Sequence, residues 1–240
     1  MNPANPDAQA GQFRHAERAQ HSVLTRAEKK TLAWLAARMP RWVSSDHLTA
    51  LSLLAMLLAG GSYWLARYDR RGLLLVCGWL AVNWFGDSLD GTLARFRNTP
   101  RPRYGFYVDH IVDTLGALAL LGGLALSGYM SPLAAAVLLI AYYILSIEVY
   151  LATYCLGTFR MSFGGLGPTE LRILLGVANV WLYFTARVPM VQVFGMDVRV
   201  FDVGAMIAAA GMLAMTVATA IRHTRALYQA EPIKKPTPGD

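Results

Sequence analysis

The amino-acid sequence predicts an all-α integral membrane protein with six transmembrane helices plus an N-terminal amphipathic interfacial helix. Of its 240 residues, 55% are apolar and only 15% are charged, and the mean hydropathy is +0.36. A soluble domain carries about 25% charged residues. The charges fall in short runs and leave apolar stretches of roughly 20 residues, the length that a bilayer core demands. This composition excludes a disordered chain, a secreted disulfide scaffold and an ordinary soluble enzyme.

The apolar periodicity divides the chain into four segments. Residues 1–25 lack periodicity and have no apolar stretch typical of a signal peptide, so we expect a flexible tail. Residues 26–43 are predicted to form an amphipathic helix on an anionic leaflet, or else a solvated helix packed on the rest of the protein. Its apolar residues recur at helical spacing and its basic residues lie between them: Leu32, Leu35, Met39 and Val43, with Lys29, Lys30, Arg38 and Arg41. Residues 44–222 then form a six-helix domain, and 223–240 a cytoplasmic tail.

Six apolar stretches predict the membrane spans, at about 47–66, 72–94, 105–128, 132–156, 170–187 and 200–221. An even number of spans places both termini on one side of the membrane. That side then carries 17 of the 22 Lys and Arg, and the positive-inside rule makes it the cytoplasmic side. Membrane topology therefore explains the net charge of +7, and we expect no nucleic-acid partner. Cys77 and Cys155 lie inside apolar stretches and are expected to be buried free thiols.

Four aspartates lie near the membrane surface, in the second and third spans: Asp87, Asp90, Asp109 and Asp113. Each charge at bilayer depth costs roughly 2.5–3.5 kcal/mol, so something must compensate. Asp87 and Asp90 are three residues apart, and Asp109 and Asp113 four apart, so each pair shares a helix face. The short connection makes the two helices antiparallel neighbours, and the four carboxylates can converge.

Hard oxygen ligands without His or Cys partners favour Mg²⁺, Mn²⁺ or Ca²⁺ over zinc, and four negative charges would balance two divalent cations. Two alternatives remain open. The aspartates could pair with the arginines of the 95–104 connection or cap helix ends, or they could form a cation or proton relay in a transporter. Their position at one depth favours a reaction site facing the cytosol.

The residues around these aspartates form a longer pattern. Asp87-Ser-Leu-Asp90-Gly91-Thr-Leu-Ala94-Arg95 is followed, nine residues later, by Gly105-Phe-Tyr-Val-Asp109-His-Ile-Val-Asp113. This pattern resembles the motif of the CDP-alcohol phosphatidyltransferase family, DxxDGxxAR, eight or nine residues, GxxxDxxxD, and all eight fixed positions match. Members of that family move a substituted phosphate from a CDP-linked donor to an alcohol in phospholipid biosynthesis and release CMP. The family's architecture, six helices with an N-terminal amphipathic helix, agrees with the segments above.

The resemblance implies roles for individual residues. Asp87, Asp90, Asp109 and Asp113 would hold two divalent cations, Mg²⁺ or Mn²⁺, and Asp113 would also be the catalytic general base. CDP-diacylglycerol is the favoured donor. The alternative, similar to aminoalcohol phosphotransferases, is a CDP-choline- or CDP-ethanolamine-like donor with diacylglycerol as acceptor, which the Gly-Pro-Thr-Glu stretch at 167–170 suggests. The expected substrate-binding residues are Gly91, Arg95, Gly105, Thr49, Arg160, Glu170 and Arg172.

Several further residues leave alternatives open. Asp46 replaces the Asn of the Asn-x-x-Thr stretch that opens the first helix in many family members, while Ser44 or Ser45 is expected to cap this helix. His110 is expected to face away from the Asp109 and Asp113 pair. Glu148 could line the same cavity or form an interhelical hydrogen bond. Small residues on the third span form a ridge that could serve a homodimer contact, common in the family, or internal packing: Ala119, Gly123 and Ser127.

Overall fold

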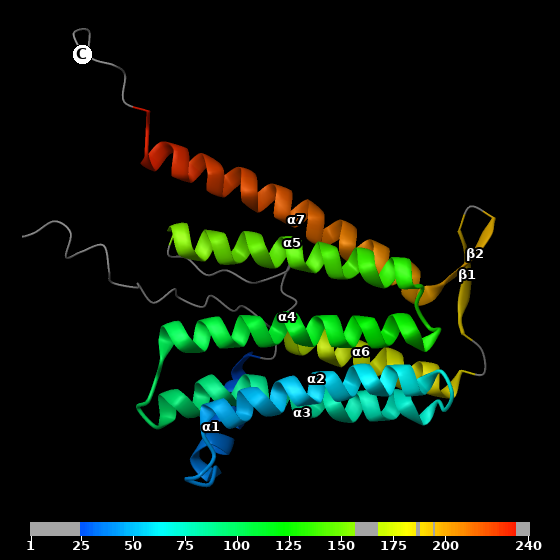
Figure 1. Cartoon of the computed structure of the whole chain (residues 1–240), viewed down its shortest axis with the longest axis horizontal. Coiled ribbons are helices and arrows are strands. Elements are labelled where there is room, and N and C mark those ends of the chain that lie inside the picture. Colours follow the sequence, from blue (N-terminus) through cyan, green and yellow to red (C-terminus); the bar gives the residue numbers. More distant parts are fainter. Residues whose placement is uncertain (1–24, 157–167, 186–187, 194, 234–240) are drawn as a thin grey trace, which may run out of the picture.

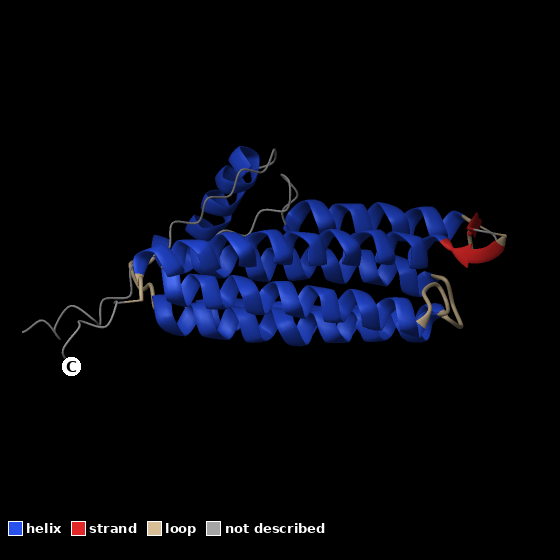
Figure 2. Cartoon of the chain, turned by 90° about the horizontal axis from the view of Figure 1, so that it is seen from above, coloured by secondary structure: helices blue, strands red, loops and turns tan. Residues whose placement is uncertain are grey.

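The computed structural model describes residues 25–156, 168–185, 188–193 and 195–233. Within them, six helices run side by side as a bundle, α1 crosses one end of it, and a β-hairpin lies at the other end (Figures 1 and 2). The elements are α1 (Thr25–Arg38), α2 (Ser45–Ala66), α3 (Arg71–Phe96), α4 (Pro102–Ser127), α5 (Pro132–Leu156), α6 (Pro168–Phe184), β1 (Met190–Val193), β2 (Met196–Arg199) and α7 (Val200–Ala230).

Five of the described helices are long and apolar enough to cross a membrane: α2, α3, α4, α5 and α7. The prediction of a helical, multi-pass membrane protein is confirmed in this coarser form. Helix α6 has 17 residues, at the lower limit for a membrane crossing, so the sixth span remains a prediction. Helix α7 continues to Ala230, beyond the predicted end of the last span at residue 221.

Local sequence signals explain where several helices begin and end. Ser44 caps α2, as predicted, and forms a capping box with His47. Pro102 occupies the first turn of α4, where a missing N–H costs nothing, and Gly128 follows the last turn with a φ of 84°. Helix α1 ends at Arg38, before the predicted residue 43, because Pro40 disfavours helical geometry at the residue before it.

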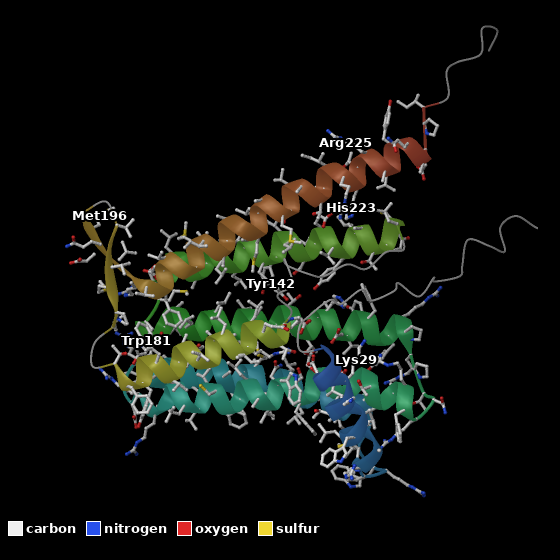
Figure 3. All side chains as sticks on the ribbon, turned by 180° about the vertical axis from the view of Figure 1, so that it is seen from behind. Lys29, Tyr142, Trp181, Met196, His223 and Arg225 are labelled. Atoms are coloured by element: carbon white, nitrogen blue, oxygen red, sulfur yellow. The ribbon has the colours of Figure 1, made fainter. Side chains whose placement is uncertain are left out.

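The hairpin formed by β1 and β2 is an element that the sequence analysis missed. Its strands pair antiparallel, with Met190 opposite Arg199 and Val193 opposite Met196. Gly195 adopts a φ of 79°, which a tight hairpin turn requires. The strands are only four residues long, too short for an alternation of apolar and polar residues to predict a strand. Figure 3 shows Met196 on the hairpin and Lys29 on α1 at opposite ends of the bundle.

Helix α2 lies at the centre of the packing, between α3 and α4; α6 packs on α3, α5 on α4, and α7 on α5. The backbones of α2 and α4 touch at the small-residue ridge. A Cβ added to Gly123 would lie 2.0 Å from the carbonyl oxygen of Gly60, and one added to Gly60 would lie 2.2 Å from that of Ala119. Two of the three ridge residues therefore serve packing within the chain, one of the two roles left open above.

A second region of packing joins α1 to the bundle. Leu32 and Ala36 of α1 are buried against Leu89 and Leu93 of α3. Arg97, just after α3, fastens the connection between α1 and α2. Its guanidinium donates hydrogen bonds to the backbone carbonyls of the connection, at 3.2 Å to Met39 and 2.8 Å to Pro40, and also to Val43.

Both cysteines are free, as predicted, but their predicted burial is wrong for Cys155, which is exposed, and only partly right for Cys77, which is half-buried. The error has a physical reason. An apolar stretch shows that a residue is withdrawn from water, and in a membrane protein lipid can cover it instead of other helices.

Candidate metal and substrate site

Three of the four predicted metal ligands meet in the structure. Asp87 of α3 and Asp109 and Asp113 of α4 each offer a carboxylate oxygen, and these oxygens all lie within 4.8 Å of one another. All three residues are half-buried. Asp109 and Asp113 share one face of α4 because they are four residues apart. Hard oxygen atoms at this spacing can share a divalent cation such as Mg²⁺ or Mn²⁺.

Asp90 stands outside this group of three and is held by α2. Its Oδ2 accepts a hydrogen bond of 2.7 Å from the Thr49 hydroxyl, and its Oδ1 accepts one of 2.5 Å from the Gly91 N–H. The Ser45 hydroxyl donates to the Asp90 carbonyl over 2.9 Å. The three-residue spacing from Asp87 thus places Asp90 nearer to α2, and Thr49 orients its carboxylate.

Arg172 connects α6 to the aspartate cluster. Its Nη2 donates a hydrogen bond of 2.6 Å to Oδ2 of Asp87, and both side chains are about four-fifths buried, with 18% and 20% exposed. Such a charge-assisted bond in a partly dehydrated site is strong, and it offsets part of the cluster's negative charge. Glu170 lies in the first turn of α6, where the helix dipole favours an acid.

The predicted glycines and Arg95 are open toward the outside of the protein. A Cβ on Gly91 would meet only the end of the Arg95 side chain, at 3.4 Å, and one on Gly105 would meet nothing within 4 Å. Arg95 is exposed, and its guanidinium donates to the Thr92 hydroxyl over 3.3 Å. Protein packing therefore does not require glycine at either position. Arg160 lies outside the described residues.

Asp46, the residue that differs from the family pattern, forms an ion pair with Arg101 in the connection between α3 and α4. Both side chains are about half exposed. The hydrogen bond to Asp46 raises the pKa of Arg101, which also stacks on the Tyr104 ring, 4.1 Å from its centroid. Asp46 thus already has a partner, an arginine of the connection between α3 and α4.

His110 is buried in an aromatic contact. Its ring centroid lies 4.1 Å from that of Phe106 and 4.5 Å from that of Tyr150. Its Nδ1 lies 2.5 Å from the Phe106 carbonyl oxygen, which can only accept, so this nitrogen carries the hydrogen. The same nitrogen is 4.0 Å from an Asp109 oxygen. His110 therefore packs among aromatic rings, next to Asp109.

Glu148 of α5 forms the interhelical hydrogen bond that was one of its two predicted roles. Its Oε1 lies 2.7 Å from Nδ1 of His223 on α7. Figure 3 shows His223 on the side of α7 that is turned toward α5. The pair ties the two helices and satisfies a carboxylate that would otherwise be costly at this depth.

Three residues that the sequence did not single out connect α1, α3 and α6. Glu28 of α1 accepts hydrogen bonds of 2.8 Å from Trp84 of α3 and of 2.8 Å from Thr169 of α6. These partners are 56 and 141 residues away in the chain. Periodicity indicates which face of a helix is apolar, but not which distant residue faces it. The one available signal was the position of Trp84, one turn before Asp87.

The fold and the site define the class of protein. The chain matches the family model described as CDP-alcohol phosphatidyltransferase over residues 42–222, and it belongs to this family. The family is one of transferases that act on substituted phosphate groups and use divalent cations.

A curated relative is archaetidylinositol phosphate synthase of Pyrococcus horikoshii, which is 33% identical over 99 residues. The aligned stretch covers 41% of this chain and 46% of the relative, less than half of either.

Proposed function

We propose that this protein transfers the phosphatidyl group of CDP-diacylglycerol to a small polar alcohol and releases CMP, as a step of phospholipid synthesis. One observation carries the proposal: in a member of this family, Asp87 of α3 and Asp109 and Asp113 of α4 gather within a bundle of membrane helices. A relative named archaetidylinositol phosphate synthase supports a role in forming a lipid with a phosphodiester-linked polar alcohol.

Asp87, Asp109 and Asp113 would hold divalent cations, with Asp90 as the fourth ligand. When bound, two cations supply positive charge that neutralises the pyrophosphate of the donor and stabilises the negative charge of the leaving CMP. Carboxylate oxygens within 4.8 Å of one another fit this requirement. Thr49 orients Asp90, and Arg172 adds a fixed positive charge beside Asp87.

Asp113 acts as the general base. It removes the proton of the acceptor hydroxyl while the hydroxyl oxygen forms a bond to the phosphorus and the bond between phosphorus and the CMP oxygen breaks. The proton goes to Asp113, and the electron pair of the broken bond leaves with CMP. Gly91 lets the donor approach α3 without meeting a side chain, and Arg95, Gly105, Arg160 and Glu170 remain candidates for contacts with the donor or acceptor.

The orientation of the site follows from charge. We infer that the end of the bundle with α1 and the connection between α3 and α4 faces the cytoplasm, because 17 of the 22 Lys and Arg then lie on that side. A water-soluble acceptor would reach the site from the cytosol, and the acyl chains of the donor would remain among the helices. Helix α1 would lie on the leaflet, where exposed Trp34 and Trp42 suit the interface.

A reconstituted transferase assay tests this function. Purified protein in liposomes is incubated with radiolabelled CDP-diacylglycerol, Mg²⁺ or Mn²⁺ and a panel of alcohols, and the lipid product is identified. We expect CMP release that requires both the dication and one class of alcohol. Product formation only from a CDP-aminoalcohol and diacylglycerol would reverse the donor assignment, and ion or proton flux without CMP release would indicate a transporter instead.

A further inference from the structure

Glu28 joins three helices through one oxygen atom. Its Oε1 accepts both the hydrogen bond from the Trp84 indole and the one from the Thr169 hydroxyl, each 2.8 Å long. Trp84 belongs to α3 and Thr169 to the first turn of α6. Through Glu28, α1 therefore contacts both α3 and α6, the helices that carry Asp87 and Arg172.

The two partners of Glu28 have a fixed relation to the cluster. Trp84 precedes Asp87 by one helical turn on α3, and Thr169 precedes Arg172 by one turn on α6. Asp87 and Arg172 are themselves joined by the 2.6 Å hydrogen bond described above. Near the site, α3 and α6 are thus connected both directly, between Asp87 and Arg172, and through Glu28 of α1.

Adhesion of α1 does not require this carboxylate. The apolar residues of α1, among them Leu32 and Ala36, are already buried against α3. Half-burying a carboxylate costs free energy unless hydrogen bonds compensate it. An apolar residue would hold α1 to α3 as well, but it would not bind the first turn of α6. What the carboxylate adds is the contact with α6.

We propose that Glu28 is a positioning residue that fixes the first turn of α6 against α3 and so holds Arg172 beside Asp87. The inference rests on the proposed function, since it gives Arg172 its role next to the donor phosphates. It also makes the position of α1 a condition for donor binding: when α1 leaves its place, the first turn of α6 loses its hydrogen bond to Glu28.

A distance measurement tests the positioning directly and needs no activity. Spin labels are placed on exposed residues of α1 and α6, at Lys30→Cys and Val177→Cys, in a chain with Cys77→Ser and Cys155→Ser, and pulsed electron resonance records the distance distribution. We expect Glu28→Ala to broaden or shift it. Glu28→Gln should preserve it, because one amide oxygen can accept both hydrogen bonds. Glu231→Ala, the same change at the exposed residue that follows α7, is the matched control and should give the parent distribution.

Two outcomes of this measurement would overturn the proposal. A Glu28→Ala distribution that superimposes on the parent would mean that α6 does not depend on Glu28. Equal changes in Glu28→Gln and Glu28→Ala would mean that charge, and not the shared hydrogen bonds, matters.

Kinetics provide the second readout. Glu28→Ala should raise the KM for the CDP donor about tenfold, a factor that corresponds to about 1.4 kcal/mol, with a smaller effect on kcat. In an Arg172→Ala background, Glu28→Ala should raise the KM for the CDP donor by less than about twofold. The effects of two residues are not additive when one acts through the other. A full tenfold effect without Arg172 would overturn the proposal. If no donor yields CMP, the proposed function fails, and the distance measurement alone decides the role of Glu28.

Discussion

Arg172 donates a 2.6 Å hydrogen bond to Asp87, so the one aspartate that α3 contributes to the three-residue cluster already has a positive partner. Only Oδ2 of the carboxylate takes part in this bond. Asp87 can therefore keep the bond to Arg172 and still offer its other oxygen to a cation. The fixed positive charge of Arg172 and an exchangeable cation can then share one carboxylate.

Replacement of Asp87 should weaken metal binding. Asp87→Ala removes one of three clustered ligands and leaves Arg172 without its partner, so we expect the dication concentration for half-maximal activity to rise at least about tenfold. Calorimetric titration with Mn²⁺ measures the same loss without turnover. Asp197→Ala, an exposed aspartate on the hairpin, is the control. An unchanged Mg²⁺ or Mn²⁺ requirement would contradict the assignment of Asp87.

Asp113→Asn should abolish turnover while donor binding stays measurable. The amide keeps an oxygen in place but cannot take a proton, and loss of a general base lowers rates by about 10²- to 10⁴-fold. Binding of radiolabelled CDP-diacylglycerol to the purified variant separates the two effects. Turnover at the wild-type rate would refute the role of Asp113 as base.

Thr49→Val tests whether the orientation of Asp90 matters. The substitution keeps the shape of the side chain but removes the donor of the 2.7 Å hydrogen bond. Loss of a partner that orients a metal ligand lowers affinity by about 10- to 100-fold, and we expect the dication requirement to rise within this range. Thr216→Val removes a hydroxyl that bonds only within α7 and is the matched control. If both variants had the same dication requirement, Asp90 would not be a metal ligand.

Adjacent glycines of α4 should respond oppositely to alanine. A Cβ at Gly123 would meet the Gly60 carbonyl at 2.0 Å, whereas one at Gly122 would meet nothing within 4 Å. Gly123→Ala should therefore destabilise the protein by about 1–3 kcal/mol or more. Gly122→Ala should stabilise it by up to about 1 kcal/mol through helix propensity. Thermal unfolding in detergent, followed by circular dichroism, measures both, and equal Tm values would contradict the close crossing.

Asp46→Asn should have little effect. The Asp46 and Arg101 side chains are 47% and 52% exposed, and such surface pairs contribute little to stability, and less at high salt. We expect turnover close to that of the parent and a Tm difference that vanishes in about 1 M salt, where the Debye length is about 3 Å. A tenfold loss of turnover would show that the carboxylate of Asp46 takes part in substrate binding.

The sequence predicted those features that depend on neighbouring residues. The helix cap at Ser44, the bounds of α5 and the shared face of Asp109 and Asp113 follow from local spacing and propensity. The motif also placed Asp87 beside them, because a short connection makes α3 and α4 antiparallel. The two helices are not the packing neighbours that were predicted, however, because both pack mainly on α2. These features needed no knowledge of the rest of the chain.

Features that join distant segments could not be predicted in the same way. The bond between Arg172 and Asp87 spans 85 residues, and nothing in either helix specifies the other as its partner. Glu28 was not singled out in the sequence, because its partners lie on α3 and α6, 56 and 141 residues away. The separation of Asp90 from the other three aspartates depends on Thr49 and hence on how α2 lies against α3.

The contact of Gly60 with Ala119 and Gly123 also determines which parts of the molecule can move during a catalytic cycle. Where two backbones touch, neither helix can rotate or slide without a steric collision. Helices α2 and α4 therefore form a rigid frame, and Asp109 and Asp113 travel with it. We therefore expect any helix movement that accompanies substrate binding to involve the helices outside this pair.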